Sequence, residues 1–170
     1  MELSRSWMAG LYGLAVLAKV LTTVWSAVRL PDRLASHFGA SGAADGWSSR
    51  SDYLALNIII VILVVVGIPA IGLAATRGSG MGLSVPHKEY WLRPENRPEL
   101  RRRLGSDLLF FAAVTALLLA WIDVLVVRAN ESPVQSMGAS SWVAIGAYLV
   151  VVLGWTVWVA TKRYAVPAQS

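Results

Sequence analysis

The side chains most able to do chemistry in this sequence are two ionisable groups inside apolar runs. Lys19 interrupts the first apolar run near its middle, and Asp123 lies inside the third, nearer its far end. A charge inside a membrane span is costly and is a functional hypothesis by default. The pair is interpreted either as an ion pair that fixes helix packing or as a proton or substrate relay. Asn57, in the second run, either joins this pair or hydrogen-bonds between helices.

A second group of reactive side chains lies in the polar stretch from Leu30 to Asp52. It contains His37, one of two histidines, together with Asp32, Asp45 and Trp47. Imidazole and carboxylates together can bind zinc, but this spacing matches no metal motif, so we expect no metal. The simplest interpretation is a structured re-entry loop. The functional hypothesis is a surface that binds a ligand or a partner, with these four side chains in contact with it.

The sequence also predicts how this stretch folds locally. Pro31 ends or redirects the preceding helix. Three glycines supply tight turns, namely Gly39, Gly42 and Gly46. Ser49, three residues before Asp52, resembles a capping box that starts the next helix.

Catalytic signatures are missing from the sequence. It contains no HExxH, GxSxG, P-loop or Rossmann pattern, and with no cysteine it can form neither a disulfide nor a thiolate site. We therefore expect a protein that is not an enzyme and that has no cofactor. The net charge of +5 indicates basic loops facing anionic lipid headgroups, and nucleic acid is not an expected partner.

The elements that position these residues are four long apolar segments. Hydrophobic residues make up 56% of the chain and charged residues 15%, against roughly 25% in soluble domains. Segments of this length and apolarity are typical of transmembrane helices. We predict an all-α membrane protein that forms one integral membrane domain over 1–170, with spans at about 7–28, 53–75, 104–127 and 141–160. Gly67, Pro69 and Gly72 predict a kink in the second span.

The positions of the basic residues predict the orientation. Most lie in the segment between the second and third spans or near the two termini, which places those parts in the cytoplasm. Leu30–Asp52 then forms a structured outer loop between the first two spans. Arg101, Arg102 and Arg103 lie in the basic cytoplasmic loop, where we expect them to contact lipid headgroups. In residues 87–91 of the same loop, Tyr90 and Trp91 are expected to anchor at the headgroups, with docking of a cytosolic partner as the alternative.

The Leu30–Asp52 stretch resembles the signature of the domain-of-unknown-function family 1648. In the sequence LPDRLASHFGASGAADGWSSRSDY, the residues that carry the resemblance are Leu30, Pro31, Asp32, His37, Phe38, Gly42, Asp45, Trp47, Ser49 and Arg50. The usual proline before the histidine is replaced here by Ala35. A second similar block lies in the middle loop, at Val85, Pro86, Lys88, Tyr90, Trp91, Leu92, Pro94, Glu95 and Arg97.

The same domain occurs at the N-terminus of SdpI-type membrane proteins, which give bacteria immunity to a secreted toxic peptide. The resemblance implies a bacterial inner-membrane protein that protects against a peptide or senses one, although SdpI-type proteins usually have additional spans. Two alternatives stay open. One is a small transporter or proton-coupled module that uses Lys19 and Asp123, and the other is an accessory subunit of a larger membrane complex or an oligomer. Membrane lipids are expected partners in every case.

Overall fold

The computed structural model describes residues 5–77 and 84–166. Within these ranges four helices are long and apolar enough to cross a membrane. They cover Ser6–Arg29, Arg50–Ala75, Arg97–Glu131 and Ala139–Arg163. The protein is therefore a multi-pass membrane protein. Four long apolar helices agree with the number predicted, and the third begins at Arg97, well before the apolar segment at Leu104.

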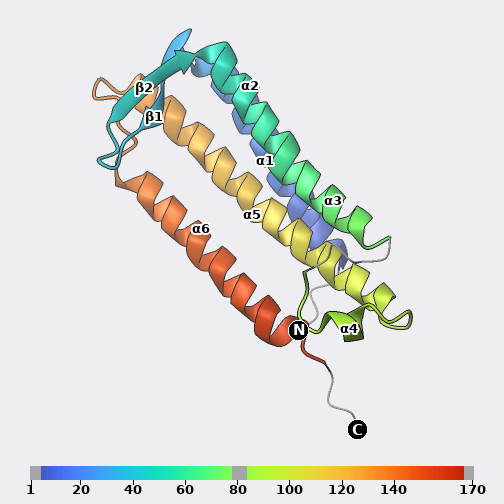
Figure 1. Ribbon diagram of the computed structural model, residues 1–170. Coiled ribbons are helices and arrows are strands. Elements are labelled where there is room, and N and C mark those ends of the chain that lie inside the picture. The colour runs from blue at the N-terminus through green and yellow to red at the C-terminus, as the bar shows by residue number, and fades with distance from the viewer. Residues whose placement is uncertain (1–4, 78–83, 167–170) are drawn as a thin grey trace.

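The elements follow one another in a simple up-and-down order (Figure 1). They are α1 (Arg5–Arg29), β1 (Arg33–Phe38), β2 (Ala44–Ser49), α2 (Arg50–Ile60), the π-helix η1 (Val61–Gly67), α3 (Ile68–Ala75), α4 (Lys88–Trp91), α5 (Arg97–Glu131), α6 (Ala139–Trp158) and the π-helix η2 (Val159–Arg163). The second span is thus α2, η1 and α3 in succession. The fourth is α6 followed by η2.

Helix α5 is the centre of the bundle. It packs along α1, α3 and η1, and half of its most apolar stretch is buried. Ala15 of α1 meets Ala113 and Ala116 of α5 in one buried cluster, which Val65 of η1 completes. Because lipid is as apolar as these side chains, close backbone approach between small residues is what favours association here.

An irregularity of the second span lies just before its proline, while the predicted kink itself stays a prediction. Residues Val61–Gly67 form π-helical turns, and the N–H of Ile68 bonds to the carbonyl of Leu63. Pro69 then occupies the first turn of α3, where a missing N–H is tolerated. A π-turn widens the helix and is often found at functional positions.

The loop between α1 and α2, predicted to be structured, contains strands that the sequence did not predict in an otherwise helical fold. It contains a β-hairpin in which β1 and β2 pair antiparallel, from Arg33 opposite Ser49 to Phe38 opposite Ala44. The register shifts on both sides of His37, as in a β-bulge. The predicted cap of α2 is confirmed, because the N–H of Asp52 donates to Ser49 Oγ at 3.0 Å.

Helix α6 stands beside α5 and apart from the other spans (Figure 1). None of its residues from Ala139 to Trp158 is buried. The start of α1 and the end of α6 lie at the end of the bundle that carries α4, opposite the hairpin (Figure 1). Four spans place both ends on one side, which is compatible with the predicted orientation. Which side faces the cytoplasm stays a prediction.

Candidate functional site

The hairpin brings His37 and Asp45 together at its exposed face. His37 Nδ1 and Asp45 Oδ1 are 2.5 Å apart, and their side chains are 76% and 52% exposed. The pair joins β1 to β2 across the sheet. The sequence predicted both residues in one candidate surface, and the register of the hairpin supplies the contact between them.

Two of the loop glycines leave room for this pair. A Cβ at Gly46 would lie 2.9 Å from the Cβ of His37, and one at Gly39 would lie 2.9 Å from Asp45 Oδ2. Gly42 has a different role, because its φ of +82° is a conformation that other residues rarely adopt. The predicted turn function therefore fits Gly42 best, while Gly39 and Gly46 permit close approach.

The hairpin is fastened to the α5–α6 connection, so it is a braced platform. The side chain of Asn130 donates to the carbonyl of Ala35 at 2.9 Å and accepts from its N–H at 2.8 Å. At the hairpin tip, Ala44 N–H donates to the carbonyl of Gln135, and Met137 N–H donates to the carbonyl of Gly42. Beneath it lies a buried cluster of Leu30, Leu34, Val126 and Val127.

The other two predicted site residues, Asp32 and Trp47, have contacts outside the His37–Asp45 pair. Asp32 accepts from Arg50 at 2.7 Å, and Arg50 also donates to the carbonyl of Leu30, which ties the base of the hairpin to α2. Trp47 sits opposite Ala35 and is 48% exposed. Asp32 thus has a structural partner, while Trp47 presents an aromatic surface.

A cavity of about 200 Å³ lies below the hairpin, between α5 and α6. Ser36, His37 and Phe38 line its upper rim. Its lower walls are mainly apolar, with Leu118, Ile122 and Leu125 from α5, and Ala144 and Ile145 from α6. A volume of this size suits one apolar side chain or a short hydrocarbon segment.

The two charges inside the spans form an ion pair. Lys19 Nζ lies 2.5 Å from Asp123 Oδ2, and the two side chains are 2% and 0% exposed. Asn57 joins this ion pair, which was one of the two predicted alternatives. Its oxygen accepts from Lys19 at 2.7 Å, and its nitrogen donates to Asp123 Oδ1 at 2.7 Å. The pair therefore connects α1, α2 and α5.

Every polar position of this buried network has a partner. Lys19 donates to Asp123, Asn57 and Thr23, which accounts for its three ammonium hydrogens. Asp123 also accepts from Thr22 at 3.0 Å and from Tyr53 at 3.0 Å. Full satisfaction is what allows two charges to be buried at low cost.

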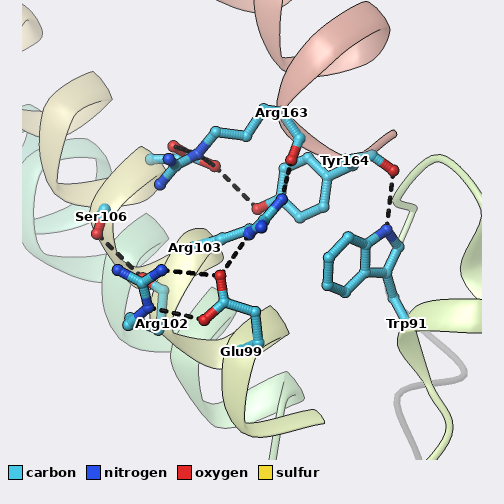
Figure 2. A network of polar contacts seen from close by, with 8 residues as sticks. Trp91, Glu99, Arg102, Arg103, Ser106, Arg163 and Tyr164 are labelled. Atoms are coloured by element: carbon cyan, nitrogen blue, oxygen red, sulfur yellow. Dashed lines mark hydrogen bonds and ion pairs between the residues drawn. The ribbon is translucent and has the colours of Figure 1, made fainter. Parts of the chain in front are cut away.

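At the opposite end of the bundle a polar cluster fixes α6 to α5 (Figure 2). Asp107 accepts from Arg163 Nε at 3.0 Å and from the Tyr164 hydroxyl at 2.8 Å. The Trp91 indole donates to the carbonyl of Tyr164 at 2.9 Å. Burial, followed by the negative charge of Asp107, raises the pKa of the Tyr164 phenol, which keeps it a donor.

This cluster changes the interpretation of Trp91 and Tyr90. Trp91 is 2% exposed and packs with Leu100 and Tyr164, so it is a core residue and the expected headgroup anchor is wrong for this side chain. Tyr90 packs edge-on against Trp91. The sequence could not distinguish a buried aromatic residue from one at the membrane interface, because both can have the same neighbouring residues in the chain.

The three consecutive arginines have intramolecular partners. Arg102 and Arg103 both pair with Glu99, at 2.7 and 2.6 Å (Figure 2). Arg103 also donates to the carbonyl of Arg163 and lies over the Trp91 ring, 4.8 Å from its centroid. Arg101 donates to Thr76 at 3.2 Å. Their contact with lipid headgroups stays a prediction.

Part of the chain matches a known protein family. Residues 14–63 match the family described as Domain of unknown function (DUF1648). This match covers less than a third of the chain, so it shows a DUF1648 segment within this protein. The DUF1648 segment covers most of α1, the hairpin, α2 and the start of η1. No curated protein and no solved structure gives a significant match.

The DUF1648 segment contributes most of both candidate sites. It holds His37, Asp45 and Trp47 of the hairpin, and Lys19 and Asn57 of the buried network. The completing residues come from α5, where Asp123 closes the network and Asn130 clamps the hairpin. Across residues 5–77 and 84–166, no group of three or more histidine, cysteine or acidic side chains could hold a metal ion.

Several members of these clusters were not predicted from the sequence. They are Thr22, Thr23 and Tyr53 in the buried network, Asn130 at the hairpin, and Asp107 with Tyr164 at the other end of the bundle. Asp107 and Asn130 carry a usable signal, because each is a polar residue close to an apolar run. The hydroxyl residues carry none, since threonine and tyrosine are common in spans.

Proposed function

We propose that this protein is a non-enzymatic recognition module whose outer hairpin binds a peptide or a membrane-protein partner. The observation that supports it best is the His37–Asp45 pair, which is exposed on a hairpin braced by Asn130 and by the α5–α6 connection. A connector loop needs neither an exposed contact between histidine and aspartate nor an exposed tryptophan. A fixed platform lowers the entropy lost on binding.

The chemistry of the surface suggests the kind of ligand. Asp45 offers a carboxylate to a basic group, Trp47 offers an aromatic face, and the cavity beneath His37 accepts an apolar side chain. A secreted peptide that is basic and apolar has this combination. In the inner membrane of a bacterium, with the hairpin outward, such a module would serve immunity to the peptide or its detection.

Growth of a deletion strain under a panel of secreted antimicrobial peptides tests the proposal. We expect the wild-type protein to restore growth against at least one peptide, and His37→Ala and Asp45→Ala to abolish that protection. Val134→Ala is the matched control, since Val134 is exposed in the α5–α6 connection beside the hairpin. Full protection by both hairpin variants at wild-type membrane levels would refute the recognition role.

Proton-coupled transport is the second candidate, and the direct contact between Lys19 and Asp123 is what favours it. A relay residue must exchange its proton, whereas here all three ammonium hydrogens have acceptors. Flux in liposomes under a pH gradient is the test. Flux that Asp123→Asn abolishes would support transport, and no flux under any gradient would count against it.

An accessory subunit is the third candidate. It draws support from α6, in which no residue from Ala139 to Trp158 is buried by the chain itself. Such a helix is open to a neighbouring protein or to lipid. Purification from native membranes tests this role, and a partner in fixed stoichiometry is the supporting result.

A further inference from the structure

Arg128 is an exposed cation whose charge has no anionic partner in residues 5–77 and 84–166. It lies near the end of α5 on the hairpin side, and its guanidinium is 6.0 Å from the centroid of the Trp121 ring. The nearby Arg29 differs, because it pairs with Glu131 at 2.5 Å. A guanidinium at the end of a span is suited to bind phosphate with two hydrogen bonds.

Two apolar grooves run from the region of Arg128 into the membrane. The first, about 430 Å³, lies between α1 and α5 and is lined by Leu21, Thr22, Trp25, Val124, Arg128 and Glu131. The second, about 260 Å³, lies between α5 and α6, where Leu117 and Trp121 face Ala147 and Val151. Arg128 lines the first groove and lies over Trp121, which lines the second. One cation thus lies in the first groove and close to the hairpin-side end of the second.

The length of this surface matches one leaflet. From Leu117 to Arg128 the helix rises about 16 Å at roughly 1.5 Å per residue. Half of a hydrocarbon core of roughly 30 Å is about 15 Å. An anion held at Arg128 would therefore lie at headgroup level, and the deep end of the second groove would lie near the middle of the bilayer.

We propose that this surface binds one diacyl phospholipid from the leaflet on the hairpin side. Its phosphate binds Arg128, one acyl chain lies in the α1–α5 groove and the other in the α5–α6 groove. The occupant follows from charge and shape together, since the site offers one cation between two apolar channels. Glu131 does not oppose the phosphate strongly, because Arg29 neutralises it. Trp25 places an aromatic ring at the level of the headgroup.

Binding of defined lipids to the delipidated, detergent-solubilised full chain tests the proposal by native mass spectrometry. The probes are a diacyl phosphatidylglycerol, its single-chain lysolipid, a diacylglycerol with the same chains, and inorganic phosphate. We expect one diacyl phospholipid per chain, with weaker binding of the lysolipid and of diacylglycerol. Equal binding of diacylglycerol would exclude a role for the phosphate, and equal binding of inorganic phosphate would exclude the grooves.

Matched arginine variants separate this site from general lipid adhesion. We expect Arg128→Gln to weaken phosphatidylglycerol binding about fivefold and Arg128→Lys to retain most of it. Arg33→Gln is the control, because Arg33 is an exposed arginine on the hairpin and lines neither groove. If Arg128→Gln and Arg33→Gln bind the lipid equally well, the proposal fails.

A groove variant tests the second chain. Ala147→Phe fills the α5–α6 groove, so we expect it to bind the diacyl lipid no more tightly than the lysolipid. Unchanged preference for two chains would overturn the placement of the second chain. Circular dichroism of the variant checks its fold, and Arg128→Gln decides the proposal if Ala147→Phe does not fold.

Discussion

Two close pairs of ionisable side chains in this protein have the same separation and opposite surroundings. Lys19 and Asp123 are 2.5 Å apart inside the bundle, and His37 and Asp45 are 2.5 Å apart on the hairpin. The first pair is almost wholly buried and the second is mostly exposed. Distance alone therefore says little about what a pair contributes, because the cost of removing charges from water decides it.

The surroundings also decide which pair is free to act. The buried pair is enclosed by Asn57, Tyr53 and two threonines, so its hydrogen-bonding capacity is used within the protein. The exposed pair has accessible surface on both partners and stands above a cavity. We infer that the first pair fixes three helices relative to one another, and the second is available to a ligand.

The largest expected effect comes from breaking the buried pair. Asp123→Ala leaves the Lys19 ammonium without its anion, and we expect it to destabilise the fold by about 3–5 kcal/mol. Reversible unfolding in mixed detergent micelles measures this change. The double variant Lys19→Met with Asp123→Leu should recover much of the stability, because no lone charge remains buried. A loss below about 1 kcal/mol for the single variant would contradict a stabilising pair.

The next effect concerns the support of the exposed pair. Asn130→Ala leaves the N–H and carbonyl of buried Ala35 without their side-chain partners, at an expected cost of about 1–3 kcal/mol. Hydrogen exchange should accelerate in β1 and β2 and stay unchanged where α1 packs on α5. Ser132→Ala, at the C-cap of the same helix, is the control. Unchanged exchange in the hairpin would show that the platform does not depend on Asn130.

A smaller effect on stability is expected from filling the space between β1 and β2. Gly46→Ala places a methyl group 2.9 Å from the His37 Cβ, which forces His37 to move, at about 1–2 kcal/mol. The NMR signal of the hydrogen bond between His37 and Asp45 should disappear. Gly138→Ala tests a glycine that is needed for its backbone conformation and not for space. Gly138 has a φ of +63° and open space around its Cβ position. Retention of the His37 signal in Gly46→Ala would mean that the strands adjust.

The smallest effect on stability is expected from the exposed pair itself. His37→Ala should change the free energy of unfolding by at most about 1 kcal/mol, since exposed ion pairs contribute little. The same variant should lose protection against the secreted peptide in the growth experiment. A loss of stability as large as that of Asp123→Ala would remove the contrast between the two pairs and make His37 a structural residue.

The sequence by itself determined the membrane class and the four spans. Lipid supplies no hydrogen bonds, so a long apolar segment has to become a helix, and this rule acts without knowledge of the neighbours. The cap at Ser49 was equally local, because Ser49 bonds within three residues. The candidate residues Lys19, Asp123, His37 and Asp45 were visible as charged or titratable groups in unusual places.

Only the tertiary structure decided how those residues pair and what encloses them. Lys19 and Asp123 are 104 positions apart, and their contact depends on how α1 lies against α5. The hairpin was not predicted, because its pairing is completed by Asn130 of α5 and Gln135 of the α5–α6 connection, both distant in the chain. Trp91 was placed at the headgroups because burial depends on packing across elements that the chain order does not reveal. Local rules set the elements, and long-range packing set the environment that gives each charged group its role.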